Sequence, residues 1–207
     1  MKRAAPLSRV RPVLVTGFEP FGGDATNPSQ EVARALDGRV VAGRLVIGRV
    51  LPCVFGGARR ELLRLLRRHR PEVTICLGLA AGREAITPER VAINLDDARI
   101  PDNAGRQPVD QPVVRGAPAA YWSTLPVKAM VRALRNRGWP AEVSQTAGTF
   151  VCNHVFFSLM HALRRAGGRG GFIHLPSLRG HRPQGKSIGS ALTLADLVAA
   201  GETAVAV

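Results

Sequence analysis

The chain has 207 residues, the length of a single domain, and its 45% hydrophobic residues exclude a disordered polymer. No uninterrupted apolar stretch approaches about 18 residues, so we expect no transmembrane helix and no membrane partner. The formal net charge of +14 comes from 29 Lys and Arg against 15 Asp and Glu.

Strand-like and helix-like segments alternate along most of the chain. Residues 1–11 are basic and lack the apolar run of about 7–15 residues that a secretory signal needs. We expect them to form a flexible leader of a cytoplasmic protein, followed by one domain over 12–207. In this domain the patterns predict strands at 13–18, 44–51, 73–79, 90–95, 141–146 and 170–176, and helices at 27–38, 56–71, 125–137, 151–167 and 192–200.

This alternation predicts an α/β fold in which helices cover both faces of a mainly parallel sheet. The segment 73–79 (VTICLGL) is almost wholly apolar, as is typical of a strand buried on both faces. The polar stretch 96–116 is long for a connection within a compact domain. This length indicates a functional loop or a mobile one, and we expect it to be mobile without substrate.

Cys152 is the cysteine best placed for chemistry. It follows a predicted strand and opens the predicted helix 151–167, where exposed N–H groups and the helix dipole favour a thiolate. Such a position can lower a thiol pKa from about 8.5 to between about 3.5 and 7.5. His174 ends another predicted strand, so its ring should emerge at the same edge of the sheet. The two residues could form a nucleophile–base pair, although core packing remains an alternative for Cys152.

The other cysteines and histidines offer weaker candidates. We assign Cys53 and Cys76 to packing, and no CxxC pair or acidic cluster completes a metal site. His154 lies two residues from Cys152, and a helix directs such side chains differently. A third group could orient His174, but spacing does not choose among the nearby acids, which are Glu84, Glu89, Asp96, Asp97 and Asp102.

Several motifs together resemble a known family. They are VLVTGFEPFGG followed by NPS, then GREAITPERVAINLDDARIPDNAGRQP, GTFVCNHVFFSLM and GGFIHLP. In this order they are similar to the type I pyroglutamyl peptidases, over residues 13–194. The resemblance implies a cysteine peptidase that removes N-terminal pyroglutamyl residues from peptides through a thioester. It also implies a three-layer α/β/α sandwich with a mainly parallel, partly mixed sheet, a homotetramer, and no metal or organic cofactor.

The resemblance also assigns roles to residues. It implies Cys152 as nucleophile, His174 as base and Glu89 as the acid that orients the base. Arg99 resembles a residue that helps to hold the oxyanion. The residues that match the substrate pocket are Phe18, Phe21, Phe150 and, in place of the family's usual Gln, Leu79. Ala81 replaces a usual Gly, and residues 177–185 also depart from the family pattern.

Two other hypotheses remain at this stage. One is a phosphate- or nucleoside-handling enzyme, although the turn GFEPFGG lacks the Lys-Ser/Thr of a P-loop. The other is a nucleic-acid-binding protein, which the charge suggests. The arginines are scattered and aromatic residues make up only 5% of the chain, whereas single-strand binders stack bases on aromatic rings. We therefore expect peptides as substrates and no nucleic-acid partner.

Overall fold

The computed structural model describes residues 11–180 and 190–207. The predicted leader therefore lies outside the described residues except for Arg11, as does most of the divergent segment 177–185. The main sheet contains β1 (Val13–Phe18), β2 (Val40–Val41), β3 (Arg44–Leu51), β4 (Val73–Leu79), β5 (Thr87–Pro88) and β8 (Arg169–Leu175). A separate pair contains β6 (Val91–Ile93) and β7 (Ala120–Trp122). The helices are α1 (Pro28–Leu36), α2 (Gly57–His69), α3 (Val127–Arg135), α4 (Val151–Ala166) and α5 (Leu194–Ala206).

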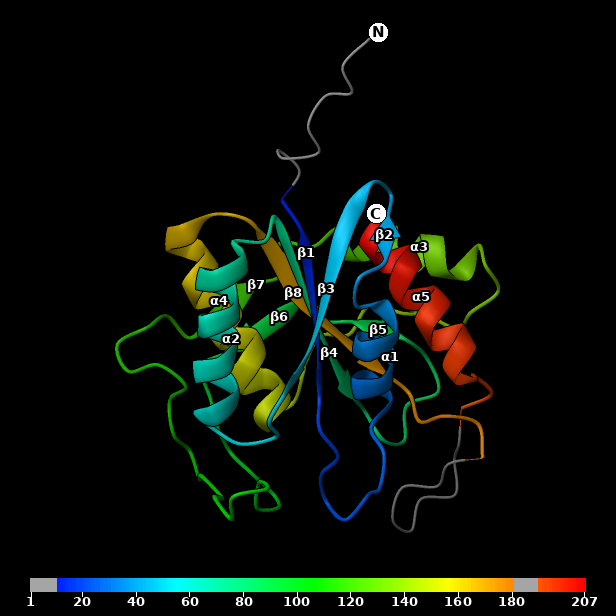
Figure 1. Ribbon diagram of the computed structural model, residues 1–207. Coiled ribbons are helices and arrows are strands. Elements are labelled where there is room, and N and C mark those ends of the chain that lie inside the picture. Colours follow the sequence, from blue (N-terminus) through cyan, green and yellow to red (C-terminus); the bar gives the residue numbers. More distant parts are fainter. Residues whose placement is uncertain (1–10, 181–189) are drawn as a thin grey trace, which may run out of the picture.

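The strand order of the main sheet is β2-β3-β1-β4-β8-β5. The four inner strands are parallel, and the short edge strands β2 and β5 are antiparallel to their neighbours. Helices α2 and α4 cover one face, and α1, α3 and α5 cover the other (Figure 1). The predicted α/β/α sandwich with a mainly parallel, partly mixed sheet is confirmed. Among the described residues, no helix is long and apolar enough to cross a bilayer.

Alternating side chains of the central strands supply two apolar cores. On β1, Val13 and Val15 pack toward α1, α3 and α5, whereas Leu14 and Phe18 pack toward α2 and α4. All residues of β1 and β4 are buried, because both faces of these strands are covered. The sheet thus separates the two cores.

Helix α1 lies unusually close to the sheet. Asn27 caps it by accepting a hydrogen bond from the Ser29 N–H at 3.0 Å. A Cβ atom added to Gly48 on β3 would lie 1.9 Å from the Ala33 carbonyl oxygen of α1. A Cβ atom added to Gly17 on β1 would lie equally close, 1.9 Å, to the Ser29 carbonyl oxygen. Both β1 and β3 therefore need a glycine where α1 crosses them.

Two predicted strands differ from the structure. Residues 141–146 form only isolated bridges, Ile86 with Ala141 and Glu89 with Ser144. The partner strand β5 is two residues long and contains Pro88, which has no N–H to extend a ladder. The predicted strand 90–95 is shortened to β6, which pairs with β7 outside the main sheet.

The loop 96–116 is held by hydrogen bonds. The Asp102 carboxylate accepts from the backbone N–H groups of Phe55, Ala104 and Arg106 at 2.8–2.9 Å. Asp96 and Gln111 form an antiparallel bridge across the loop. These contacts hold the loop around Asp102 and between Asp96 and Gln111. The mobility of the loop stays a prediction.

We predict that Gly48→Ala destabilises the protein by about 2–3 kcal/mol, because α1 must move away from β3 to make room for the methyl group. Urea unfolding followed by circular dichroism measures the change. Arg34→Ala, on the exposed side of the same helix, is the control and should cost less than about 0.5 kcal/mol. Equal midpoints for the two variants would contradict the close-contact argument.

Candidate active site

A cavity of about 380 Å³ opens at the carboxyl ends of the parallel strands, where ligands bind in sheets of this type. Strand β4 contributes Leu79 to its lining, β8 contributes His174, and the first turn of α4 contributes Cys152. The structure therefore brings together the two reactive residues that the sequence singled out. Leu79, Phe21, Phe150 and Arg99 from the predicted set also line this cavity.

Cys152 lies beside His174 because the sheet has no side chain between them. Gly78 is the register partner of His174 in the β4–β8 ladder. A Cβ on Gly78 would lie 3.0 Å from the Cys152 Sγ, so the sulfur rests on the bare backbone of this glycine. Neighbouring strands are only about 4.8 Å apart, so the imidazole lies next to Gly78 on the face that carries the sulfur, and both side chains line the cavity.

A buried carboxylate holds the His174 ring. The His174 Nδ1 is 2.7 Å from the Glu89 Oε1, and the side chain of Glu89 is fully buried. Thr87 of β5 pairs with His174, and the Glu89 N–H donates to the Phe172 carbonyl at 2.9 Å. This pairing fixes Glu89 behind the ring. With a proton on Nδ1, the imidazole leaves Nε2 free to accept.

The pKa of Cys152 moves in the direction opposite to our expectation. The pKa of this thiol is raised to about 12, mainly by burial and also by the charge of Glu89, while the charge of Arg83 opposes the rise. The desolvation of the sulfur thus outweighs the stabilisation of a thiolate at the start of α4. Burial also lowers the pKa of His174, although Glu89 opposes that shift. The resting pair is therefore a thiol beside a neutral imidazole.

Aromatic rings form one wall of the cavity. Phe21 and Phe150 pack with their ring centroids 5.8 Å apart, and Phe55 packs edge-on against Phe150 at 5.4 Å. Phe18 is not part of this wall. It is 2% exposed and packs in the core against Phe172, with centroids 6.3 Å apart.

The remaining polar candidates lie elsewhere. Cys53 and Cys76 are buried in the core, and burial raises both thiol pKa values. His154 is buried with its Nδ1 2.8 Å from Asp96, and its Nε2 accepts from the Gly56 N–H. Both nitrogens of this ring are occupied. In the described part of the chain, no three His, Cys, Asp or Glu side chains are grouped to hold a metal ion.

Of the five acids that the spacing left open, Glu89 alone contacts His174. Glu84 is exposed, Asp97 lines the cavity, and Asp96 and Asp102 form the contacts described above. A further residue, Arg83, was not among the candidates, and its Nη1 is 2.8 Å from the Glu89 Oε1. No local signal singles it out in a chain with 29 basic residues.

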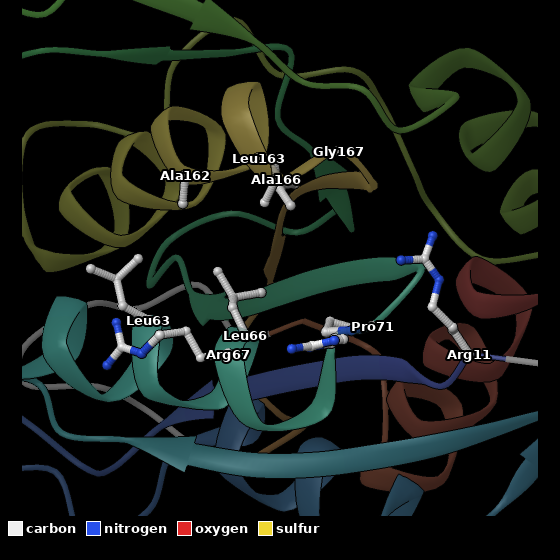
Figure 2. Close-up of a pocket in the computed structure, with 10 residues that line it drawn as sticks. Arg11, Leu63, Leu66, Arg67, Pro71, Ala162, Leu163, Ala166 and Gly167 are labelled. Atoms are coloured by element: carbon white, nitrogen blue, oxygen red, sulfur yellow. The ribbon is translucent and has the colours of Figure 1, made fainter.

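A second cavity, of about 340 Å³, lies between α2 and α4 at the far end of α4 from Cys152 (Figure 2). Leucine side chains, including Leu63, Leu66 and Leu163, face it together with Arg67 and Arg11. The described residues that line it include no thiol, histidine or acid. It is not a candidate for catalysis.

Comparison with known proteins assigns the family. The family model described as pyroglutamyl peptidase matches residues 11–207. The chain belongs to the pyroglutamyl peptidase family. It is 62% identical over 169 residues to the pyrrolidone-carboxylate peptidase of Chromobacterium violaceum, a match that covers 82% of this chain and 79% of that protein.

Solved structures agree with this assignment. The pyroglutamyl peptidase I of Bacillus amyloliquefaciens has a TM-score of 0.90 with 44% identity, and the match covers 95% of both chains. The pyrrolidone carboxyl peptidase of Thermococcus litoralis has a TM-score of 0.91 with 41% identity, covering 95% of this chain and 92% of the other. The predicted family and the cysteine-type peptidase activity are confirmed.

We predict that iodoacetamide alkylates Cys152 before Cys53 and Cys76, because Cys152 is half-buried at a cavity and the other two are buried. Its pKa of about 12 means that the reactive thiolate fraction should grow about tenfold per pH unit between about pH 7 and 9. Peptide mass spectrometry of the native protein measures both effects, with Cys152→Ser as the control. Equal labelling of the three cysteines, or a Cys152 rate independent of pH, would contradict this description of the site.

Proposed function

We propose that the chain removes N-terminal pyroglutamyl residues from peptides through a thioester acyl-enzyme. Cys152 is the nucleophile, His174 the general base and acid, and Glu89 the residue that orients His174. The observation that carries these roles is the 2.7 Å contact between the buried Glu89 and His174, beside Cys152 in one cavity. No metal or organic cofactor takes part in this scheme.

The cavity lining suits the pyroglutamyl ring. This ring is a neutral, flat lactam, and its α-nitrogen carries no charge that an acidic pocket could bind. Phe21 and Phe150 supply apolar walls, and Leu79 and Ala80 bring backbone groups at the end of β4. Small-ligand sites generally combine apolar walls with a few polar groups in this way. Leu79 does not need a polar side chain if its backbone makes the contact.

The reaction begins from a thiol and a neutral imidazole. As the Cys152 Sγ attacks the pyroglutamyl carbonyl carbon, its proton passes to the His174 Nε2. Glu89 stabilises the imidazolium that forms, through the bond to Nδ1. The imidazolium then protonates the leaving amine as the C–N bond breaks, which leaves a thioester on Sγ. Water, deprotonated by His174, hydrolyses the thioester and restores the thiol.

The oxyanion of the tetrahedral intermediate needs hydrogen-bond donors, and the N-terminus of α4 can supply them. The first N–H groups of a helix have no partners within the helix, and that of Cys152 belongs to this first turn. Arg99 lines the same cavity and adds a cation. Loss of one such donor typically costs about 10²–10³ in rate.

A cytoplasmic homotetramer remains part of the proposal. What supports it is the family resemblance alone, because exposed apolar side chains such as Val40 and Trp122 lie on strands of different sheets and do not form one patch. Light scattering of the purified protein measures the assembly.

We predict that the wild type releases a fluorescent amine from a pyroglutamyl amide under reducing conditions, and that Cys152→Ser and His174→Ala each lose at least about 10³-fold in kcat/KM. Cys53→Ala, which changes a buried thiol outside the cavity, should retain activity. The prolyl amide, which lacks the lactam carbonyl, should be a poor substrate. An inactive wild type, or an active Cys152→Ser variant, would rule out the proposed peptidase mechanism.

We further predict an acid limb of kcat/KM with its midpoint below pH 6.5. The pKa of His174 lies below its ordinary value of 6.5, so the neutral base is lost only when the pH falls below that value. Glu89→Gln removes a charge and a hydrogen bond that raise this pKa, so the limb should move to lower pH as kcat falls. A limb above pH 6.5, or an upward shift in Glu89→Gln, would be inconsistent with His174 as the base.

A further inference from the structure

Arg83 differs from the other arginines that pair with acids in the described residues. Its guanidinium makes three hydrogen bonds, from Nη1 to the Glu89 Oε1 at 2.8 Å and the Thr87 Oγ1 at 2.6 Å, and from Nη2 to the Thr146 carbonyl at 3.1 Å. The other four Arg–carboxylate pairs join partners that are both 29–61% exposed, whereas the Glu89 side chain is 0% exposed. Arg83 therefore pairs with the one fully buried carboxylate among them.

Glu89 needs a charged partner where it lies. Its Oε1 receives both the His174 ring and Arg83, while its Oε2 is buried without a hydrogen-bond partner among the described residues. A buried carboxylate is strongly destabilising unless it is paired. The neutral His174 offers only the dipole of one N–H group, so Arg83 supplies the compensating charge. The shared oxygen also fixes the direction from which Glu89 meets the ring.

Arg83 also connects two sides of the cavity. On one side, its backbone N–H donates to the Ala80 carbonyl at 3.1 Å, and Ala80 and Ala81 line the cavity. On the other side, its guanidinium holds Thr146, which directly precedes the lining residues 147–150. Backbone hydrogen bonds also anchor the segment 142–149, for example from the Asp97 N–H to the Thr149 carbonyl, but Arg83 is the side chain that joins this segment to the acid of the proposed triad.

We propose that Arg83 is a positioning residue for the peptidase reaction, which holds Glu89 against His174 and sets the spacing of the two cavity walls. This inference rests on the proposed function. Arg83 is placed to act on Cys152 and His174 through Glu89, and the roles of the three triad residues are unchanged by it.

The charges around the imidazole give this role a measurable signature. Glu89, Arg83 and Cys152 face His174, and Asp97 and Arg99 line the same cavity. The positive charge of Arg83 lowers the pKa of His174 and also that of Cys152. Without it, the imidazolium is favoured, so His174 loses its function as a base at a higher pH than in the wild type.

The test compares Arg83→Met, Arg83→Lys and the control Arg64→Met in hydrolysis of the pyroglutamyl amide from about pH 5 to 9. Arg64 also pairs with a glutamate, but on the exposed face of α2, and it does not line the cavity. We expect Arg83→Met to lose about tenfold in kcat, to raise KM, and to move the acid limb up by about one pH unit. This shift is opposite in sign to that expected for Glu89→Gln.

The Arg83→Lys variant distinguishes the effect of the positive charge from that of the guanidinium's hydrogen-bond geometry. Lysine keeps the positive charge but lacks the planar fork that reaches Glu89 and Thr146 together. We expect its acid limb to stay near the wild-type position while its KM rises. Arg64→Met should match the wild type in all three quantities.

The outcomes distinguish this inference from the proposed function. An inactive wild type defeats the proposed function itself. An active wild type with an unshifted limb in Arg83→Met overturns the role of Arg83 alone. If circular dichroism shows that Arg83→Met does not fold, Arg83→Lys decides: a raised KM supports the inference, and wild-type kinetics overturn it.

Discussion

The burial of the Glu89 carboxylate beside His174 is the constraint on which the site depends. A carboxylate without solvent is stable only with partners on its oxygens, and two side chains share Oε1. Both contacts exist because the short edge strand β5 runs antiparallel to β8 and delivers Glu89 next to the end of that strand. The edge of the sheet and the reaction chemistry therefore depend on the same few hydrogen bonds.

The burial that holds the imidazole also bears on how the proposed nucleophile, Cys152, would be activated. It raises the pKa of the Cys152 thiol and lowers that of His174, so that neither group carries a charge before substrate arrives. In the proposed mechanism, activation is then coupled to attack, with the proton leaving the sulfur as the new bond forms. A resting thiol is also less exposed to oxidation and alkylation than a thiolate, because the thiolate is the reactive form.

Much of this arrangement could be predicted from local patterns. The strands 13–18, 44–51 and 73–79 coincide with β1, β3 and β4. Strands β1 and β4 are mostly apolar because both of their faces are covered, whereas β3 is only partly buried. The meeting of Cys152 and His174 followed from a helix start and a strand end at one edge of the sheet. The choice of Glu89 among five acids depends on the pairing of β5 with β8, which is distant in sequence, and only the family motif indicated it. The direction of the Cys152 pKa shift depends on burial, and the contacts of Arg83 depend on the loop at Thr146. Neither the pKa shift of Cys152 nor the contacts of Arg83 can be predicted from a local sequence pattern.

Beneath the Cys152 sulfur, Gly78 presents main chain in place of a side chain. The distance of the sulfur from the sheet is therefore set by backbone atoms. These atoms move less than a side chain that can change its rotamer. A single methyl group at this position would lift Sγ and press on the ring of Phe172 without altering any group that reacts. The absence of a side chain at Gly78 thus helps to determine the position of the Cys152 Sγ.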